Sequence, residues 1–295
     1  MMPREYFPTK NPDYLRENPL SAHWIRTFIS FNYSASHGVV TASRSNAGTV
    51  WRYTMTAGMK IPINYAEAAE TLKKYLKLTG SPVAFRFATK KEDIPAGMEA
   101  LDKTIRHCSM VGLARNEGRI FYSTADKHEC NGGGWALGLK EITERLKTGD
   151  FYYKLGKFES SAACKRTIDR VPHLQTGETY ATMYAPLEKT TFDPQVVIIV
   201  ATPWAMLKLA QSTMFRLGGR IQSEFAGIQS VCSDACAQTY LTGHVNFSLG
   251  CDGSRKFSGI EDGELVIGIP AELLPEISEA LKVVAAAPGS KPGSK

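Results

Sequence analysis

The chain has 295 residues, 43% of them hydrophobic and 22% charged, which is enough to bury a sizeable core in one large domain or two small ones. Half of its formal net charge of +6 lies in the first 58 residues, so the rest is nearly neutral and a nucleic-acid-binding face is not expected. No stretch approaches the roughly 20 apolar residues of a membrane span, and the N-terminus does not resemble a signal peptide. We therefore expect a cytoplasmic protein, without nucleic-acid or membrane partners, whose cysteines stay reduced.

Residues 1–58 predict little regular structure, because they contain four scattered prolines and a Ser/Asn/Gly-rich stretch without a sustained period. Two interpretations are open for this segment. It is either a partly ordered N-terminal extension or upstream sequence that precedes a natural start at Met59. The single globular domain is predicted over residues 59–285.

Helix and strand patterns alternate from residue 59 onward. Apolar spacing predicts a helix over residues 65–78, and aromatic and β-branched residues predict a strand over 81–88. The elements that follow are a helix around Cys108 that ends near Gly118, a strand over 119–123, an amphipathic helix over 135–146 and a short helix over 160–168. The first half of the domain is thus predicted to end near residue 177.

The second half, residues 178–285, contains the most apolar run of the chain, QVVIIVAT at 195–202, which predicts a buried central strand. Pro203 follows it at a position suited to the first turn of a helix. The other predicted elements are strands over 179–187, 245–249 and 264–269, and helices over 203–217, from Cys232, and over 271–284. This alternation predicts an α/β or α+β fold with a mixed sheet, and the tail, residues 286–295, is expected to be disordered.

Two stretches of the chain share one outline, and each is bounded by a pair of cysteines. The first runs from Cys108 to Cys130, and the second from Cys232 to Cys251. In both, Cys-Ser is followed by an alanine, a glycine, a short strand that ends near a serine, and then Cys-x-Gly. The pattern predicts two related helix–strand–loop units, each with one cysteine at a helix start and one in a loop.

Six phrases of the sequence, in order, resemble a family known as domain of unknown function number 169. They are CSMVGLAR, HECNGGGWALGL, YAPLEKTTFDPQVVIIVATPWAMLKLAQ, VCSDACAQTYLTG, LGCDGSRKFSG and ELVIGIPAELLPEI. The resemblance covers residues from about 60 to 285 and leaves residues 1–58 unmatched. It implies a common fold, and no reaction follows from it.

The four cysteines that bound the two units occupy equivalent places: Cys108, Cys130, Cys232 and Cys251. If the units pair about a pseudo-two-fold axis, four thiols converge, and four thiolates suit an iron–sulfur cluster or zinc. Structural zinc usually draws on Cys-x-x-Cys pairs, which the sequence lacks, so the wide spacing favours a [4Fe–4S] type of cluster over zinc. The alternatives are inert buried thiols and, third, a thiol that acts in catalysis or disulfide exchange.

Three basic residues follow the cysteine elements and are candidates for binding an anion: Arg115, Arg255 and Lys256. They would neutralise an anionic cluster or clamp a carboxylate or phosphate. Solvated surface charge is the alternative. Asp234 is either a helix-capping residue or an acid beside Cys232.

Three glycines, Gly132, Gly133 and Gly134, precede a predicted helix and are candidates for an anion site at its N-terminus. His107 and His128 each lie next to a cysteine unit. We expect them on the partly exposed surface rather than as metal ligands. Cys164 and Cys236 are assigned to core packing.

The leading hypothesis from the sequence is a thiolate-bound iron–sulfur cluster, or failing that another metal, with a redox or substrate-activating role. The second hypothesis is a metal-free binding module that holds a small anionic metabolite between the two halves. The third is a plain interaction protein. No motif assigns a catalytic residue, a reaction, an electron-transfer partner or an oligomeric state.

Overall fold

The computed structural model describes residues 39–45, 48–54 and 63–287, and the chain divides into two compact units, residues 1–62 and 63–295. In the first unit, β1 (Val39–Ser45) and β2 (Gly48–Thr54) pair antiparallel. This hairpin lies in the segment for which the sequence predicted little regular structure. The proposed start at Met59 and the tail from residue 288 lie outside the described residues.

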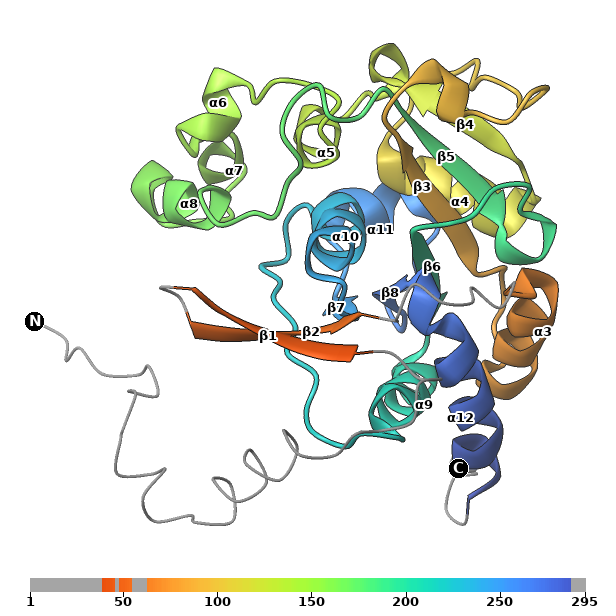
Figure 1. The fold of residues 1–295 in the computed structure, drawn as a ribbon. Helices are drawn as coiled ribbons and strands as arrows, with labels where there is room; N and C mark the ends of the chain where they lie inside the picture. Colours follow the sequence, from red (N-terminus) through yellow and green to blue (C-terminus); the bar gives the residue numbers. More distant parts are fainter. Residues whose placement is uncertain (1–38, 46–47, 55–62, 288–295) are drawn as a thin grey trace, which may run out of the picture. The chain divides into compact units, whose positions relative to one another are not determined.

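The second unit is built on a six-stranded sheet with the strand order β4-β5-β3-β6-β8-β7 (Figure 1). Its strands are β3 (Val83–Ala88), β4 (Phe121–Thr124), β5 (Ala181–Pro186), β6 (Val196–Ala201), β7 (Asn246–Ser248) and β8 (Leu265–Pro270). Neighbouring strands pair antiparallel throughout. The predicted α/β or α+β class is confirmed, and where a mixed sheet was expected the antiparallel pairing corresponds to the α+β alternative.

Helices cover both faces of this sheet. The helices that precede β6 in the chain are α3 (Tyr65–Leu76), α4 (His107–Glu117), α5 (Asn131–Ala136), α6 (Glu144–Lys147), α7 (Asp150–Lys154) and α8 (Ser161–Ile168). Those that follow are α9 (Pro203–Met214), the π-helix η4 (Ser230–Gln238), α10 (Thr239–Thr242), α11 (Asp252–Ser258) and α12 (Leu274–Ala286). Short 3-10 turns are η1 (Lys91–Asp93), η2 (Ala125–Lys127), η3 (Leu187–Lys189) and η5 (Ala271–Leu273).

The core lies on the two faces of the sheet, as the sequence of β6 shows. Its alternate residues Val197, Ile199 and Ala201 join a cluster with α3, α9 and α12. Val196 and Ile198 belong with Val200 to the opposite cluster, which contains residues of α4, α5 and η4. Both faces are buried, so the strand reads as a continuous apolar run, and the predicted buried central strand is confirmed.

The strand order is symmetrical about the junction between β3 and β6. In chain order, the first three strands, β3, β4 and β5, take a central, an edge and an intermediate position, and the last three, β6, β7 and β8, take the same positions on the other side. Such symmetry agrees with the hypothesis of two related units, which itself stays a prediction. The expected boundary between the two halves near residue 177 likewise stays a prediction.

Two predicted elements differ from the structure. The amphipathic helix expected over residues 135–146 is wrong, because α5 ends at Ala136 and Gly138 turns the chain with a left-handed φ of 72°. The loop expected at Cys251 is the start of helix α11 instead.

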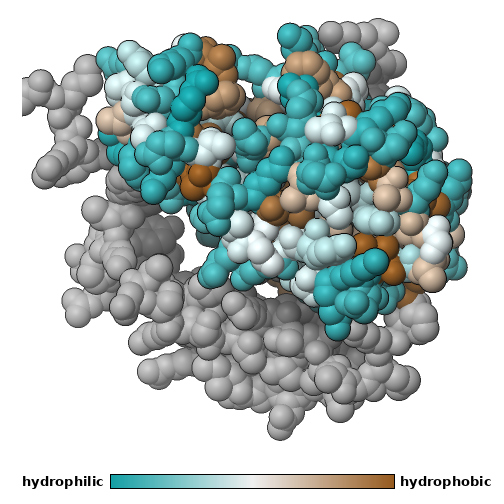
Figure 2. All heavy atoms as spheres, turned by 90° about the horizontal axis from the view of Figure 1, so that it is seen from above, coloured by the Kyte–Doolittle hydropathy of each residue, from teal (hydrophilic) through white to brown (hydrophobic). Residues whose placement is uncertain are grey.

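On the face drawn in Figure 2, apolar residues form separate small patches among hydrophilic ones.

Candidate functional site

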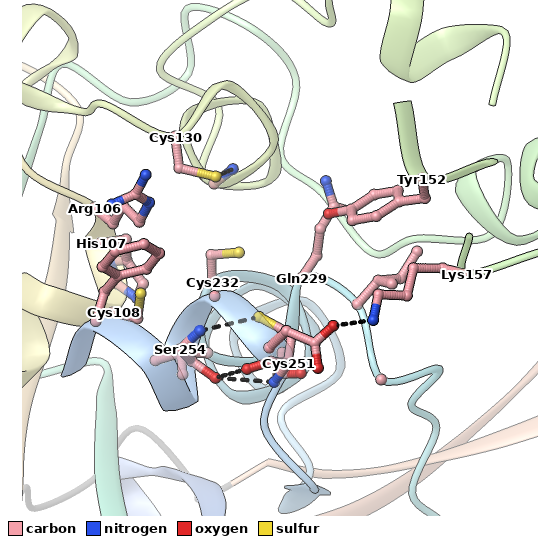
Figure 3. A pocket seen from close by; sticks show the side chains of 18 of the residues that line it. Arg106, His107, Cys108, Cys130, Tyr152, Lys157, Gln229, Cys232, Cys251 and Ser254 are labelled. Atoms are coloured by element: carbon pink, nitrogen blue, oxygen red, sulfur yellow. Dashed lines mark hydrogen bonds and ion pairs between the residues drawn. The ribbon is translucent and has the colours of Figure 1, made fainter. Parts of the chain in front are cut away.

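A cavity of about 270 Å³ opens on the sheet face that carries α4, α5 and η4. It is lined by all four cysteines that bound the two sequence units, Cys108, Cys130, Cys232 and Cys251. Figure 3 shows their side chains arranged around one space. The structure therefore brings together four thiols that lie up to 143 positions apart in the chain, from residue 108 to residue 251.

Each of the four thiols comes from the beginning of a helix. Cys108 is the second residue of α4 and Cys232 the third residue of η4. Cys130 and Cys251 are the N-caps of α5 and α11, and their sulfurs accept the backbone N–H groups of Gly133 and Ser254, each at 3.4 Å. Helix N-termini present unpaired N–H groups and partial positive charge, so these positions suit sulfurs that bind a metal as thiolates.

Gly133 lies between two of the thiols. A methyl group on its Cα would lie 3.8 Å from Cys130 Sγ and 3.8 Å from Cys232 Cβ. Cys130 and Cys232, which come from different units of the sequence, are therefore near neighbours. Gly133, one of the three glycines predicted to bind an anion, also lines the cavity.

The helix that carries Cys232 is a nine-residue π-helix where the sequence predicted an α-helix. π-Helical segments are rare and occur frequently at functional sites. This one approaches strand β8 so closely that a Cβ on Gly268 would lie 1.9 Å from the carbonyl oxygen of Ala235. Only glycine at position 268 permits this approach, which places Cys232 at the wall of the cavity.

The four thiols influence one another electrostatically. Burial, with smaller contributions from the nearby thiols of Cys251 and Cys130, raises the pKa of Cys108 to about 12. Burial likewise raises the pKa of Cys232 well above its ordinary range, with added contributions from Cys130, Cys251 and Cys108. Without a bound cation these two thiols are protonated, and a metal must displace the protons.

Two cations line the cavity, and each is paired. Arg106 forms an ion pair with Glu129 at 2.8 Å and stacks its guanidinium over Phe257 at 3.7 Å. Lys157 forms an ion pair with Asp252. The walls beside them are apolar and include Leu155 and Ile228.

The three basic residues predicted to bind an anion do not line this cavity. Arg115 is buried and donates to Glu264 at 2.6 Å, to Thr79 at 3.0 Å and to the carbonyl of Gly259 at 3.3 Å. Its guanidinium is therefore not a solvated surface charge, which was the alternative expected from the sequence. It is also not presented to a ligand in the cavity.

The other two basic candidates also face away from the cavity lining. Arg255 donates to the carbonyl oxygens of Leu249, Glu261 and Glu264, so it fixes the loops around α11. Lys256 is exposed and lies over the Phe257 ring at 5.3 Å. Two of the predicted glycines, Gly132 and Gly134, are buried in α5 behind Gly133.

Asp234 is buried in η4, where Ser248 donates a hydrogen bond to it at 2.7 Å. Burial raises the pKa of Asp234 to about 7. Its backbone carbonyl accepts a hydrogen bond from Asn246 of β7. Asp234 thus ties the π-helix to the edge strand and does not line the cavity.

The expectation that His107 and His128 lie on the surface is wrong. They are only 2% and 1% exposed, and their rings stack with centroids 6.5 Å apart. His107 contacts Tyr184 Oη at 2.8 Å and Cys236 Sγ at 3.4 Å. Burial lowers the pKa of each histidine to about 3, so both are neutral core residues at ordinary pH.

The described part of the chain contains no preassembled group of metal ligands. Among the described residues, no three His, Cys, Asp or Glu side chains lie close enough together to bind a single metal ion. A mononuclear zinc site is therefore not preformed in this part of the chain. All six cysteines are free, and Cys164 and Cys236 are buried as predicted.

Sequence reasoning missed several residues of the cavity wall, among them Arg106, Tyr152, Lys157, Gln229 and Phe257. They come from α7 and the turn after it, from α11, and from the segments before α4 and η4. No motif joins them, since only the fold brings these segments together.

The fold and the site define an α+β protein with a four-thiol cavity on one face of an antiparallel sheet. The chain belongs to the DUF169 family, described as "Uncharacterised ArCR", which matches residues 71–280 and confirms the resemblance seen in the sequence. It is 43% identical over 217 residues to "Uncharacterized protein MJ0308" of Methanocaldococcus jannaschii, an alignment that covers 73% of this chain and 93% of the relative. No solved structure matches. None of the described helices has the length and apolar character to cross a bilayer.

Proposed function

We propose that Cys108, Cys130, Cys232 and Cys251 bind an iron–sulfur cluster, and that the protein acts in a redox or substrate-activation step. The observation that carries the proposal is the convergence of four thiols, each from a helix start, on one cavity. In a [4Fe–4S] cluster each cysteine binds a different iron, so the sulfurs stand roughly 6–7 Å apart, wider than around a single ion. A donor set of four thiols suits such a cluster, and the wide sequence spacing of the cysteines, without Cys-x-x-Cys pairs, favours it over structural zinc.

The surroundings of the thiols fit a buried anionic centre. Backbone N–H groups of Gly133 and Ser254 already point at two of the sulfurs, and such hydrogen bonds raise the reduction potential of a cluster. A bound cluster would supply one-electron transfer or a Lewis-acidic iron. The chain would hold its four sulfurs in place and exclude bulk water from them. The proposal places the protein in the cytoplasm, where thiols stay reduced.

The alternative of a small anionic metabolite has less support. It relied on Arg115, Arg255 and the predicted glycine loop over residues 132–134. Gly133 lines the cavity, whereas both guanidinium groups are engaged by protein acceptors outside it. The two cations that do line the cavity, Arg106 and Lys157, are already paired with carboxylates.

The test is anaerobic purification followed by iron and acid-labile sulfide analysis and visible absorption spectroscopy. We expect iron and sulfide in comparable amounts and a broad absorption near the blue end of the spectrum. Cys232→Ser should lose most of both, whereas Cys164→Ala, outside the cavity, should retain them. A wild-type protein that binds neither iron nor sulfide after anaerobic reconstitution would refute the proposal.

A further inference from the structure

Gln229 stands at the edge of the four-thiol cavity in a backbone conformation that its residue type disfavours. Its φ is 52° and its ψ is 39°, a left-handed conformation in which glycine has the least strain. Its carbonyl oxygen accepts the N–H groups of Ser233 and Asp234 and so begins the π-helix η4. Glycine would perform this backbone role, so the side chain of Gln229 requires a separate explanation.

That side chain is buried, but it makes no hydrogen bond with the protein. Gln229 is 3% exposed, and neither Nε2 nor Oε1 has a partner among the described residues. Both Gln229 and the next residue, Ser230, line the cavity, and the hydroxyl of Ser230 is likewise buried without a partner. A buried amide without hydrogen bonds is costly, whereas a methionine of similar shape would be tolerated.

The neighbouring helix is shaped to admit this amide. A Cβ on Gly132 would lie 2.5 Å from Gln229 Nε2, so any larger residue there would displace the amide. In Figure 3 the amide lies on the same side of the cavity as Tyr152, away from Cys108 and Arg106. A strained backbone, an unpartnered amide and a glycine that makes room for it coincide at one cavity, as expected of a binding residue rather than a packing residue.

We propose that Gln229, assisted by Ser230, binds a neutral planar organic ligand through a lactam-type edge, in which an N–H group adjoins a carbonyl. The amide of glutamine offers one acceptor and two donors, and a lactam edge pairs with it through two hydrogen bonds. The two cations that line the cavity, Arg106 and Lys157, already form ion pairs with carboxylates. A neutral ligand therefore suits the cavity better than an anion.

The remaining walls suit a flat apolar ring. Leu155, Ile228 and Phe257 line the cavity beside Tyr152, and a mostly apolar lining with few polar groups is typical of small-molecule sites. The cavity of about 270 Å³ has room for one or two fused rings. Identifying this ligand as the substrate of the cluster rests on the proposed function, whereas its hydrogen bonds to Gln229 do not.

The test compares two probes that differ by one methyl group, 2-quinolone and N-methyl-2-quinolone. Affinities are measured by ligand-detected NMR on the full chain, both after chelator treatment and after anaerobic cluster reconstitution. We expect the wild type to bind 2-quinolone at least about tenfold more tightly, because methylation removes the N–H donor. Gln229→Met should bind both probes equally, and Gly132→Ala, which displaces the amide, should also lose the preference.

Stability provides the folding control. Gln229→Met should melt at a higher temperature than the wild type without ligand, because it removes the unpartnered amide. The inference is overturned if the wild type binds neither probe, binds both equally, or if Gln229→Met keeps the preference. A preference for 2-quinolone in protein without a cluster would support this inference. The cluster proposal would then be decided separately, by the iron and sulfide analysis.

Discussion

Cys130 and Cys251 cap two short helices in the same way, since each sulfur accepts the backbone N–H of the residue three positions later at 3.4 Å. Their helices, α5 and α11, follow the two edge strands of the sheet, β4 and β7. Serine, threonine, aspartate and asparagine are the usual residues at such a position, because oxygen is a stronger acceptor than sulfur. Helix capping alone therefore does not explain why both positions are cysteine. The need to present a thiol to the cavity explains it.

This relationship separates the structural role of the two cysteines from their chemical role. Cys130→Ser and Cys251→Ser should keep the helix cap, so we expect the chelator-treated variants to melt at a temperature equal to or above that of the chelator-treated wild type. Both should lose most of the iron and sulfide of the anaerobically purified protein, since an alcohol is a poor ligand for iron. Alanine variants should instead lose the cap as well, at about 1 kcal/mol each.

Cys164→Ala serves as the control for these variants, because Cys164 is buried away from the cavity. It should retain its iron and sulfide even if its stability falls. Serine variants with a full complement of both would show that Cys130 and Cys251 are not ligands.

The sequence predicted those parts of the fold whose signals are local. Strand β6 was found because both of its faces are buried, which removes polar residues from its whole length. The start of α9 was found because Pro203 occupies the first turn, and Thr202 completes the signal by accepting the N–H of Ala205. The four cysteines were found because the two units repeat their order.

The rest depends on contacts between distant segments. Gln229 has no local pattern, since its burial arises from α5 and the helices that follow it. His107 and His128 were expected on the surface, and packing against Tyr184 and Thr182 buries them. The close approach of η4 to Gly268 joins positions 33 residues apart, Ala235 and Gly268, which no local pattern of the sequence connects.

Gly268→Ala should be strongly destabilising. Its Cβ would lie 1.9 Å from the Ala235 carbonyl oxygen and 2.4 Å from Thr239 Oγ1, so η4 must move away from β8. We expect a loss of about 3 kcal/mol or more, the upper end of overpacking costs, measured by urea unfolding. Because η4 carries Cys232, the iron content should fall with it.

Gly263→Ala is the matched control for this substitution, since nothing lies within 4 Å of a Cβ at that position. Its stability should change by no more than about 0.5 kcal/mol. Equal stabilities for the two alanine variants would contradict the close approach of η4 to the sheet.

Arg115→Met should destabilise the fold without affecting the cavity. The substitution leaves Glu264 buried without its cation at 2.6 Å, and breaking such a pair typically costs about 3–5 kcal/mol. The double variant with Glu264→Gln should recover part of this loss, because no unpaired charge remains. Denaturant unfolding of the four proteins of this cycle measures the coupling. Iron content and quinolone binding of folded Arg115→Met should equal those of the wild type. A selective loss of either would show that Arg115 contributes to the cavity site.

Asp234 should make the free energy of unfolding decrease as the pH rises. Burial raises its pKa to about 7 in the folded state, whereas an unfolded aspartate titrates near 3.9, the ordinary value. Between about pH 4 and pH 7 the folded state therefore holds a proton that the unfolded state has released, so the stability from this group is lost as pH rises through 7.

Asp234→Asn removes this titration while its side-chain carbonyl can still accept from Ser248. The wild type should therefore lose a few kcal/mol relative to the variant between pH 5 and pH 8. His107 and His128, whose pKa values are lowered to about 3, change stability in the opposite direction, but they are present in both proteins and cancel in the comparison. Urea unfolding of chelator-treated protein at several pH values measures the difference. A difference that stays constant across this range would mean that Asp234 titrates at its ordinary pKa and that η4 does not bury its carboxyl group.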